Sequence, residues 1–164
     1  MCFSDTKTAV LSSTCQRRQL VSGVIAGGVA AALWPTGASA GGGEAILQPD
    51  VPDDAAFIAR AFKLRNLAVA LGDQPYGAVI VRKKVIIGHS HSRVVVEHDP
   101  TGHAELAAIR DAARRLSDRD LSGAILYSSS RPCPMCEAAA YWANIEEMKY
   151  GSDAASAGKP KLCG

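Results

Sequence analysis

Residues 99–105 read Asp-Pro-Thr-Gly-His-Ala-Glu, and residues 131–136 read Arg-Pro-Cys-Pro-Met-Cys. Each stretch follows a predicted strand and loop and opens a predicted helix. The side chains of His103, Cys133 and Cys136 supply one imidazole and two thiolates, which suit zinc and leave a fourth tetrahedral position for water. The sequence therefore predicts one zinc ion per chain, held by two segments that the fold brings together.

Glu105 is the candidate for acid/base work beside this metal. In the middle of a helix, side chains two residues apart point about 200° apart, but at a helix start His103 and Glu105 can reach one site. Glu105 would take a proton from the water and deliver it to a leaving amine, a role that typically contributes about 10²–10⁴ in rate. The positive end of the helix dipole would favour the Cys133 thiolate.

The spacing of apolar residues around these motifs predicts seven elements. They are a helix from Asp53 or Asp54 to about Leu71, strands at 77–81 and 85–88 joined by a tight turn at 82–84, a helix signalled at 99–101 and ending near Leu116, a strand at 124–127, a helix at 134–143 and a short strand at 148–151. Helices that alternate with short strands imply an α/β layered sheet, opened here by an antiparallel hairpin.

The H-x-E and P-C-x-x-C motifs together are the signature of zinc deaminases that act on nucleobases. From about Ala55 to Gly158 the sequence resembles the cytidine deaminase-like superfamily, in particular its guanine deaminase and tRNA adenosine deaminase branch. The resembling segments are 75–81, similar to the family's first strand, the two zinc motifs at 99–105 and 131–136, and Tyr141-Trp142-Ala143, similar to guanine deaminases specifically. The resemblance implies a three-layer α/β/α sandwich around a mixed sheet, assembled as a homodimer.

The resemblance also implies a reaction, in which the exocyclic amine of a nucleobase or nucleoside is replaced by oxygen and ammonia is released. The implied catalytic residue is Glu105, the implied zinc ligands are His103, Cys133 and Cys136, and main-chain groups of Ala104 and Cys133 are expected to touch the base. Guanine or another purine is the favoured substrate because of residues 141–143.

Three features depart from the family pattern. Ser92 stands where an asparagine usually contacts the base, and its single hydroxyl replaces an amide that both donates and accepts. Arg131 stands where a glutamate is usual. The substrate-binding acid that guanine deaminases draw from a later segment has no counterpart after Gly158. With these departures more than one base stays open as the substrate, and an inactive relative that keeps the metal is an alternative.

The body of the protein carries no excess charge. The formal net charge of +2 comes from residues 1–40, since residues 41–164 hold 15 basic and 15 acidic side chains. Nucleic-acid binding through phosphates usually requires a basic excess, so a small-molecule substrate is favoured over tRNA. No apolar run reaches the roughly 18 residues of a membrane-spanning helix.

The first forty residues resemble an export signal of the twin-arginine type. Arg17 and Arg18 precede an uncharged stretch of 14 residues from Leu20 to Leu33, and Ala38-Ser39-Ala40 is a small-residue cleavage pattern. We therefore expect a periplasmic or secreted protein cleaved near Ala40, with a linker at 41–52 and the deaminase domain at 53–164.

Several other interpretations stay open from the sequence. A C-x-x-C pair in an exported protein also suits a thiol-disulfide oxidoreductase, and a tRNA adenosine deaminase shares both zinc motifs. A structural zinc site would need a fourth ligand, for which His98 is nearest, and His89 and His91 are further candidates. Tyr141 is expected to be packing, whereas Trp142 suits either a purine pocket or the core. Cys163 is a lone thiol near the terminus.

Overall fold

A computed structural model describes residues 44–162 of the protein. Its elements are α1 (Asp54–Ala70), β1 (Gly77–Arg82), β2 (Val85–His91), α2 (Ala104–Leu116), β3 (Ala124–Ser128), α3 (Pro134–Trp142), β4 (Glu147–Tyr150) and β5 (Ala155–Gly158). The strands form one mixed sheet in the order β2-β1-β3-β4-β5. The β3 and β4 strands are parallel, and the other neighbouring pairs are antiparallel.

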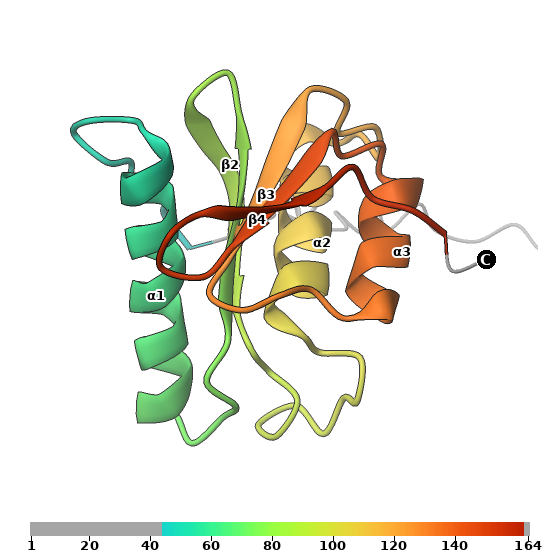
Figure 1. Cartoon of the computed structure of the whole chain (residues 1–164). Coiled ribbons are helices and arrows are strands. Elements are labelled where there is room, and N and C mark those ends of the chain that lie inside the picture. The colour runs from blue at the N-terminus through green and yellow to red at the C-terminus, as the bar shows by residue number, and fades with distance from the viewer. Residues whose placement is uncertain (1–43, 163–164) are drawn as a thin grey trace, which may run out of the picture. The chain divides into compact units, whose positions relative to one another are not determined.

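The sheet lies between two helical layers (Figure 1). Helix α1 covers one face, where Phe57 packs in a cluster with Val79 and Tyr127. Helices α2 and α3 cover the other face, where Ile109 joins a cluster with Ile80. Because side chains alternate along a strand, β1 contributes to both clusters and is buried on both faces. The predicted three-layer α/β/α sandwich is confirmed.

The local signals of the sequence account for the first helix and the hairpin. Asp53 caps α1, and its Oδ1 accepts a hydrogen bond from the Ala56 N–H at 2.8 Å. Lys83 and Lys84 both have positive φ, at 51° and 63°, as a two-residue turn with the twist of a β-hairpin requires. Helix α1 and the tight turn were predicted at these positions.

Helix α2 begins later than its predicted start signal at 99–101. Its N-cap is His103, and its first helical residue is Ala104. Asp99 closes a turn in front of the helix, where its Oδ1 accepts hydrogen bonds from the Thr101 N–H and hydroxyl at 2.8 and 2.7 Å. His103 is thus the cap of the helix itself, in agreement with the prediction that this ligand lies at a helix start.

Two strands also differ from the prediction. The β2 strand continues to His91, which pairs with Gly77 across the hairpin. The β5 strand was not predicted, because its residues Ala-Ser-Ala-Gly lack the apolar alternation that marks a strand. It pairs with β4 at the edge of the sheet.

The predicted export signal at residues 1–40 and the first residues of the predicted linker lie outside the described residues. Further along this linker, the Gln48 side-chain amide forms two hydrogen bonds of 2.8 Å with the backbone N–H and C=O of Ile86 on the edge strand β2. Between residues 44 and 162, no helix is long and apolar enough to cross a membrane.

Asp73 ties the loop after β2 to the end of α1. Its Oδ2 accepts hydrogen bonds from the backbone N–H groups of Val95 and Val96 at 3.0 and 2.9 Å, and its Oδ1 accepts one from Gln74 at 2.7 Å. Burial alone raises the pKa of Asp73, but backbone hydrogen bonds, the strongest from Val96, and the nearby Ser92 hydroxyl lower it to about 2. The loop that leads into α2 is thus held by a buried carboxylate.

Asp73→Asn removes the charge with little change of shape. The pKa of Asp73 falls from 3.8 to about 2 on folding, so its charge stabilises the protein above about pH 4, and this contribution is lost as the pH falls toward about 2. We expect Asp73→Asn to lower the free energy of unfolding by about 1–3 kcal/mol at neutral pH. Urea unfolding should show that the difference in free energy of unfolding between variant and wild type becomes smaller as the pH falls from about 4 toward about 2. A difference that is independent of pH would contradict this role of Asp73.

Candidate metal centre

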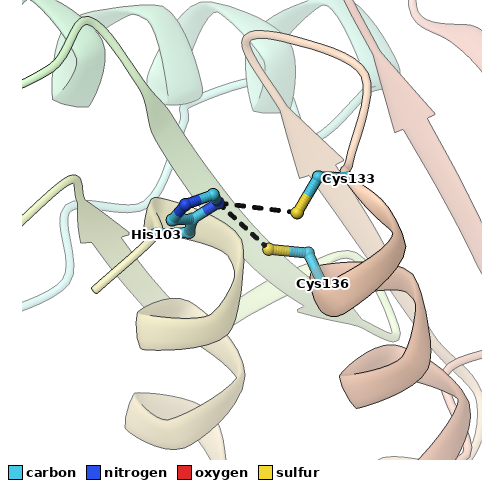
Figure 2. A group of neighbouring side chains, drawn as sticks. All are labelled: His103, Cys133 and Cys136. Atoms are coloured by element: carbon cyan, nitrogen blue, oxygen red, sulfur yellow. Dashed lines mark hydrogen bonds between the residues drawn. The ribbon is translucent and has the colours of Figure 1, made fainter. Parts of the chain in front are cut away.

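Two helix starts meet on one side of the sheet. His103 is the N-cap of α2, Cys133 is the N-cap of α3, and Cys136 lies in the first turn of α3. Pro134 occupies the first turn of α3, where its fixed φ suits the helix and its missing N–H costs no hydrogen bond. Figure 2 shows the imidazole and the two thiols pointing toward one another from these two helices.

The spacing of the three ligand atoms fits a zinc ion. His103 Nδ1 lies 3.6 Å from Cys133 Sγ and 3.7 Å from Cys136 Sγ. Tetrahedral zinc with its usual Zn–N and Zn–S bond lengths separates such atoms by about 3.6 Å. In the described part of the chain, this is the one group of three His, Cys, Asp or Glu side chains whose ligand atoms lie within 4.8 Å of one another. The predicted ligand set is therefore brought together.

The electrostatics of the site favour a bound cation. Cys136 is fully buried. This burial is the main cause that raises the pKa of the Cys136 thiol, and the nearby charge of Glu105 and the Cys133 thiol raise it further. A backbone hydrogen bond from Leu106 opposes this rise. A bound cation would offset the cost of holding thiolates here, because it stabilises the deprotonated ligands directly.

Glu105 lies beside the three ligands, as the sequence predicted. It is in the first turn of α2 and only 4% exposed. One carboxylate oxygen, Oε2, is 3.7 Å from Cys136 Sγ, and the other, Oε1, accepts a hydrogen bond of 2.9 Å from the Ser128 hydroxyl. The carboxylate thus sits next to the ligand cluster without joining it, as a proton carrier should.

The two predicted substrate-binding residues are both buried near the approach to α2. Ala104 is the first residue of α2. Ser92 follows β2, and its backbone N–H donates to the Tyr76 carbonyl at 3.0 Å. The Ser92 hydroxyl is buried and forms no hydrogen bond, although it lies near enough to Asp73 to influence that pKa. Their contacts with a base stay a prediction.

The other histidines considered as ligands lie outside the cluster. His98 is in the loop before α2, and His91 Nδ1 lies 2.7 Å from the Ser92 carbonyl oxygen. His89 Nδ1 lies 3.5 Å from the Arg60 guanidinium. The structure therefore gives no fourth protein ligand among these histidines, and the centre keeps the three-ligand form associated with catalytic zinc.

The aromatic pair at the end of α3 is exposed. Tyr141 and Trp142 are 42% and 69% exposed, and their rings pack edge to face at 5.5 Å. Tyr141 therefore packs against Trp142 at the surface and is not part of the core clusters, and Trp142 does not belong to the core. Arg131 is also exposed, with its guanidinium 5.8 Å from the centre of the Tyr150 ring.

Ser128 is the contact that the sequence analysis missed. It ends β3, and its side chain points to the same face of the sheet as Leu126 because side chains alternate. That alternation, counted from the apolar residues of 124–127, is the signal that could have placed a hydroxyl under α2.

Known proteins with similar sequences match the segment that contains this centre. A family model described as the cytidine and deoxycytidylate deaminase zinc-binding region matches residues 51–152. A guanine deaminase of Bacillus subtilis is 43% identical over 106 residues, which are 62% of this chain and 68% of the relative. A tRNA-specific adenosine deaminase of Aquifex aeolicus is 38% identical over 96 residues, which are 58% of this chain and 64% of the relative. The matches span about two thirds of the length of these relatives.

Solved structures show the same architecture. The X-ray structure of the Bacillus subtilis guanine deaminase has a TM-score of 0.57 at 42% identity, covering 58% of this chain and 62% of that one. A structure from studies of tRNA:A34 deaminases has a TM-score of 0.56 at 38% identity, covering 58% of this chain and 69% of that one.

Replacement of either thiol should abolish zinc binding. We expect Cys133→Ser and Cys136→Ser to reduce bound zinc from about one ion per chain to nearly none after dialysis, because a hydroxyl is a poor zinc ligand. Cys163→Ser, the same substitution at a cysteine that follows both zinc motifs in the sequence, should keep the metal. Mass spectrometry of the metal content measures all three, and full zinc occupancy in the Cys136 variant would contradict the assignment.

Proposed function

The chain belongs to the family of the cytidine and deoxycytidylate deaminase zinc-binding region, and on this premise we propose that it hydrolytically deaminates a small-molecule purine, with guanine as the first candidate. The observation that carries the proposal is the meeting of His103, Cys133 and Cys136 beside the buried carboxylate of Glu105. This arrangement offers three metal ligands and one proton carrier, which is the minimum that the reaction requires.

The reaction exchanges the exocyclic amine of the base for oxygen. His103, Cys133 and Cys136 would hold the zinc ion, which would lower the pKa of a water molecule and so supply the nucleophile. The carbon forms a bond to the water oxygen, the carbon–nitrogen bond breaks, and the amine leaves as ammonia. Glu105 accepts one proton from the attacking water and delivers it to the departing nitrogen, so that the carboxylate is regenerated.

The environment of Glu105 suits this proton transfer. With 4% of its surface exposed, the carboxylate is largely shielded from bulk water, and its Oε2 faces the ligand cluster. Its place in the first turn of α2 also puts its charge at the positive end of the helix dipole. Buried beside the ligand cluster, the carboxylate lies where the proposed reaction needs a proton carrier.

Two observations support guanine over other bases. The Bacillus subtilis guanine deaminase is 43% identical, and the Tyr141-Trp142-Ala143 segment is similar to guanine deaminases. Trp142 ends α3, whereas Cys133 and Cys136 lie at its start, so this second support is a similarity of sequence and not a contact within the site. Ser92 in place of an asparagine weighs against a conventional guanine contact, so other purines belong in the same test.

A tRNA adenosine deaminase is the second candidate, supported by the Aquifex aeolicus relative at 38% identity. The equal numbers of basic and acidic residues in 41–164 favour a small molecule instead. Family membership favours the metal-binding interpretation of Cys133 and Cys136 over a thiol-disulfide oxidoreductase.

We further propose that the protein is exported with a twin-arginine-type signal and cleaved near Ala40, which would leave a mature chain with no membrane segment. Export in the folded state would let the metal bind before the thiols meet an oxidising compartment. A compartment poor in tRNA agrees with a small-molecule substrate. Assembly as a homodimer stays a prediction.

Glu105→Gln should abolish deamination while zinc stays bound. Because the amide cannot accept the proton, we expect ammonia release from the preferred purine to fall by about 10²–10⁴. The assay measures ammonia from guanine, adenine, cytosine, their nucleosides and tRNA, with zinc content determined on the same samples.

Glu146→Gln, the same change at an exposed position after α3, is the matched control and should retain activity. Activity on tRNA alone would support the second candidate function, a tRNA adenosine deaminase. Undiminished ammonia release by a zinc-loaded Glu105→Gln variant would contradict the role of Glu105.

Export should depend on the arginine pair. We expect the wild-type chain to yield a mature protein that begins at Gly41, and replacement of both Arg17 and Arg18 by lysine to leave the uncleaved form inside the cell, because twin-arginine signals require the pair. N-terminal sequencing and fractionation measure both outcomes. Efficient cleavage of the double variant would argue for a different export route.

A further inference from the structure

Ser128 occupies a buried position between the sheet and the start of α2. It is the last residue of β3 and is fully buried. The preceding Tyr127 packs against Phe57 on the α1 face, so Ser128 points to the opposite face, under α2 and α3. A hydroxyl at such a place costs free energy unless it forms hydrogen bonds.

The Ser128 hydroxyl donates its hydrogen bond to Glu105. It donates its single hydrogen to Glu105 Oε1 at 2.9 Å, and its oxygen lies 3.4 Å from the Ser130 N–H, which donates to it. The other contact of the carboxylate is with the Cys136 sulfur at 3.7 Å, a weak donor. Over residues 44–162, Ser128 is thus the only oxygen or nitrogen donor whose side chain is hydrogen-bonded to Glu105.

This hydrogen bond fixes the direction of the carboxylate. Ser128 ends a strand that pairs on both sides, with β1 and with β4, so its own backbone is held in place. Glu105 is at the first turn of a helix, where its long side chain has several staggered conformations. One strong hydrogen bond from a rigid strand selects among them and leaves Oε2 facing the ligand cluster.

We propose that Ser128 is a positioning residue for the deamination, whose hydroxyl holds Glu105 in the orientation from which it moves the proton. This inference rests on the proposed function. Residues that orient a reacting group in this way typically contribute about ten- to a hundredfold.

Ser128→Thr and Ser128→Val form a matched pair that tests the hydroxyl. Threonine and valine have nearly the same shape, so both add the same methyl group to the buried site and differ in the hydroxyl. We expect Ser128→Val to lower kcat by about ten- to a hundredfold with little change in KM and an unchanged zinc content, and Ser128→Thr to keep kcat near the wild-type value.

Ser156→Ala is the control, because it removes another serine–glutamate hydrogen bond, of 2.7 Å to Glu147 between β5 and β4. It should leave kcat unchanged. Equal kcat values for the threonine and valine variants would overturn the proposal. Deamination by the wild-type protein in the same assay would still support the proposed function.

Crystal structures of the zinc-loaded wild type and of Ser128→Val give a readout that does not depend on turnover. We expect the Glu105 carboxylate to turn away from the ligand cluster in the valine variant. An unchanged Glu105 would overturn the positioning role, whether or not the wild type releases ammonia from any of the tested substrates. A wild type without activity on the whole panel would contradict the proposed function separately.

Discussion

The meeting of two helix N-termini is the constraint on which the site depends. His103 and Cys133 cap α2 and α3, two helices on the same face of the sheet, so the positive ends of both dipoles point at one place. Thirty residues separate these two ligands in the chain, and 3.6 Å separates their ligand atoms in the fold. Neither helix alone could supply this set, so the layered packing of α2 and α3 on the sheet is what creates the metal centre.

The same packing places the proposed proton carrier, Glu105, and its hydrogen-bond partner. Once α2 starts at Ala104, Glu105 is directed into the space between the ligand cluster and the end of β3, where Ser128 meets it. A buried carboxylate beside the Cys136 thiol would be costly without compensation. The Ser128 hydrogen bond and the dipole of α2 supply part of that compensation, and a zinc ion held by the three ligands would supply more, so the metal site, the proposed proton carrier and the sheet are connected.

The ligand set and the α/β layering were predictable because they depend on local patterns, whereas the partner of Glu105 was not. The motifs of His103 and the two cysteines predicted the centre, apolar periodicity predicted an α/β layered sheet, and the resemblance to the deaminase superfamily implied its three layers. The start of α2 was misplaced because Asp99 is equally suited to close a turn, and the sequence does not distinguish a turn from a cap. Ser128 was missed because one serine in a serine run has no special signature until the strand register places it under α2.

The most direct test of the account is the source of the oxygen in the product. The full-length zinc-loaded protein would be incubated with guanine and the other purines in water enriched in oxygen-18, with product mass and ammonia measured together. The account predicts one labelled oxygen in the product for each ammonia released, since water replaces the exocyclic amine. A protein that holds one zinc ion per chain and yields neither labelled product nor ammonia from any purine would contradict it.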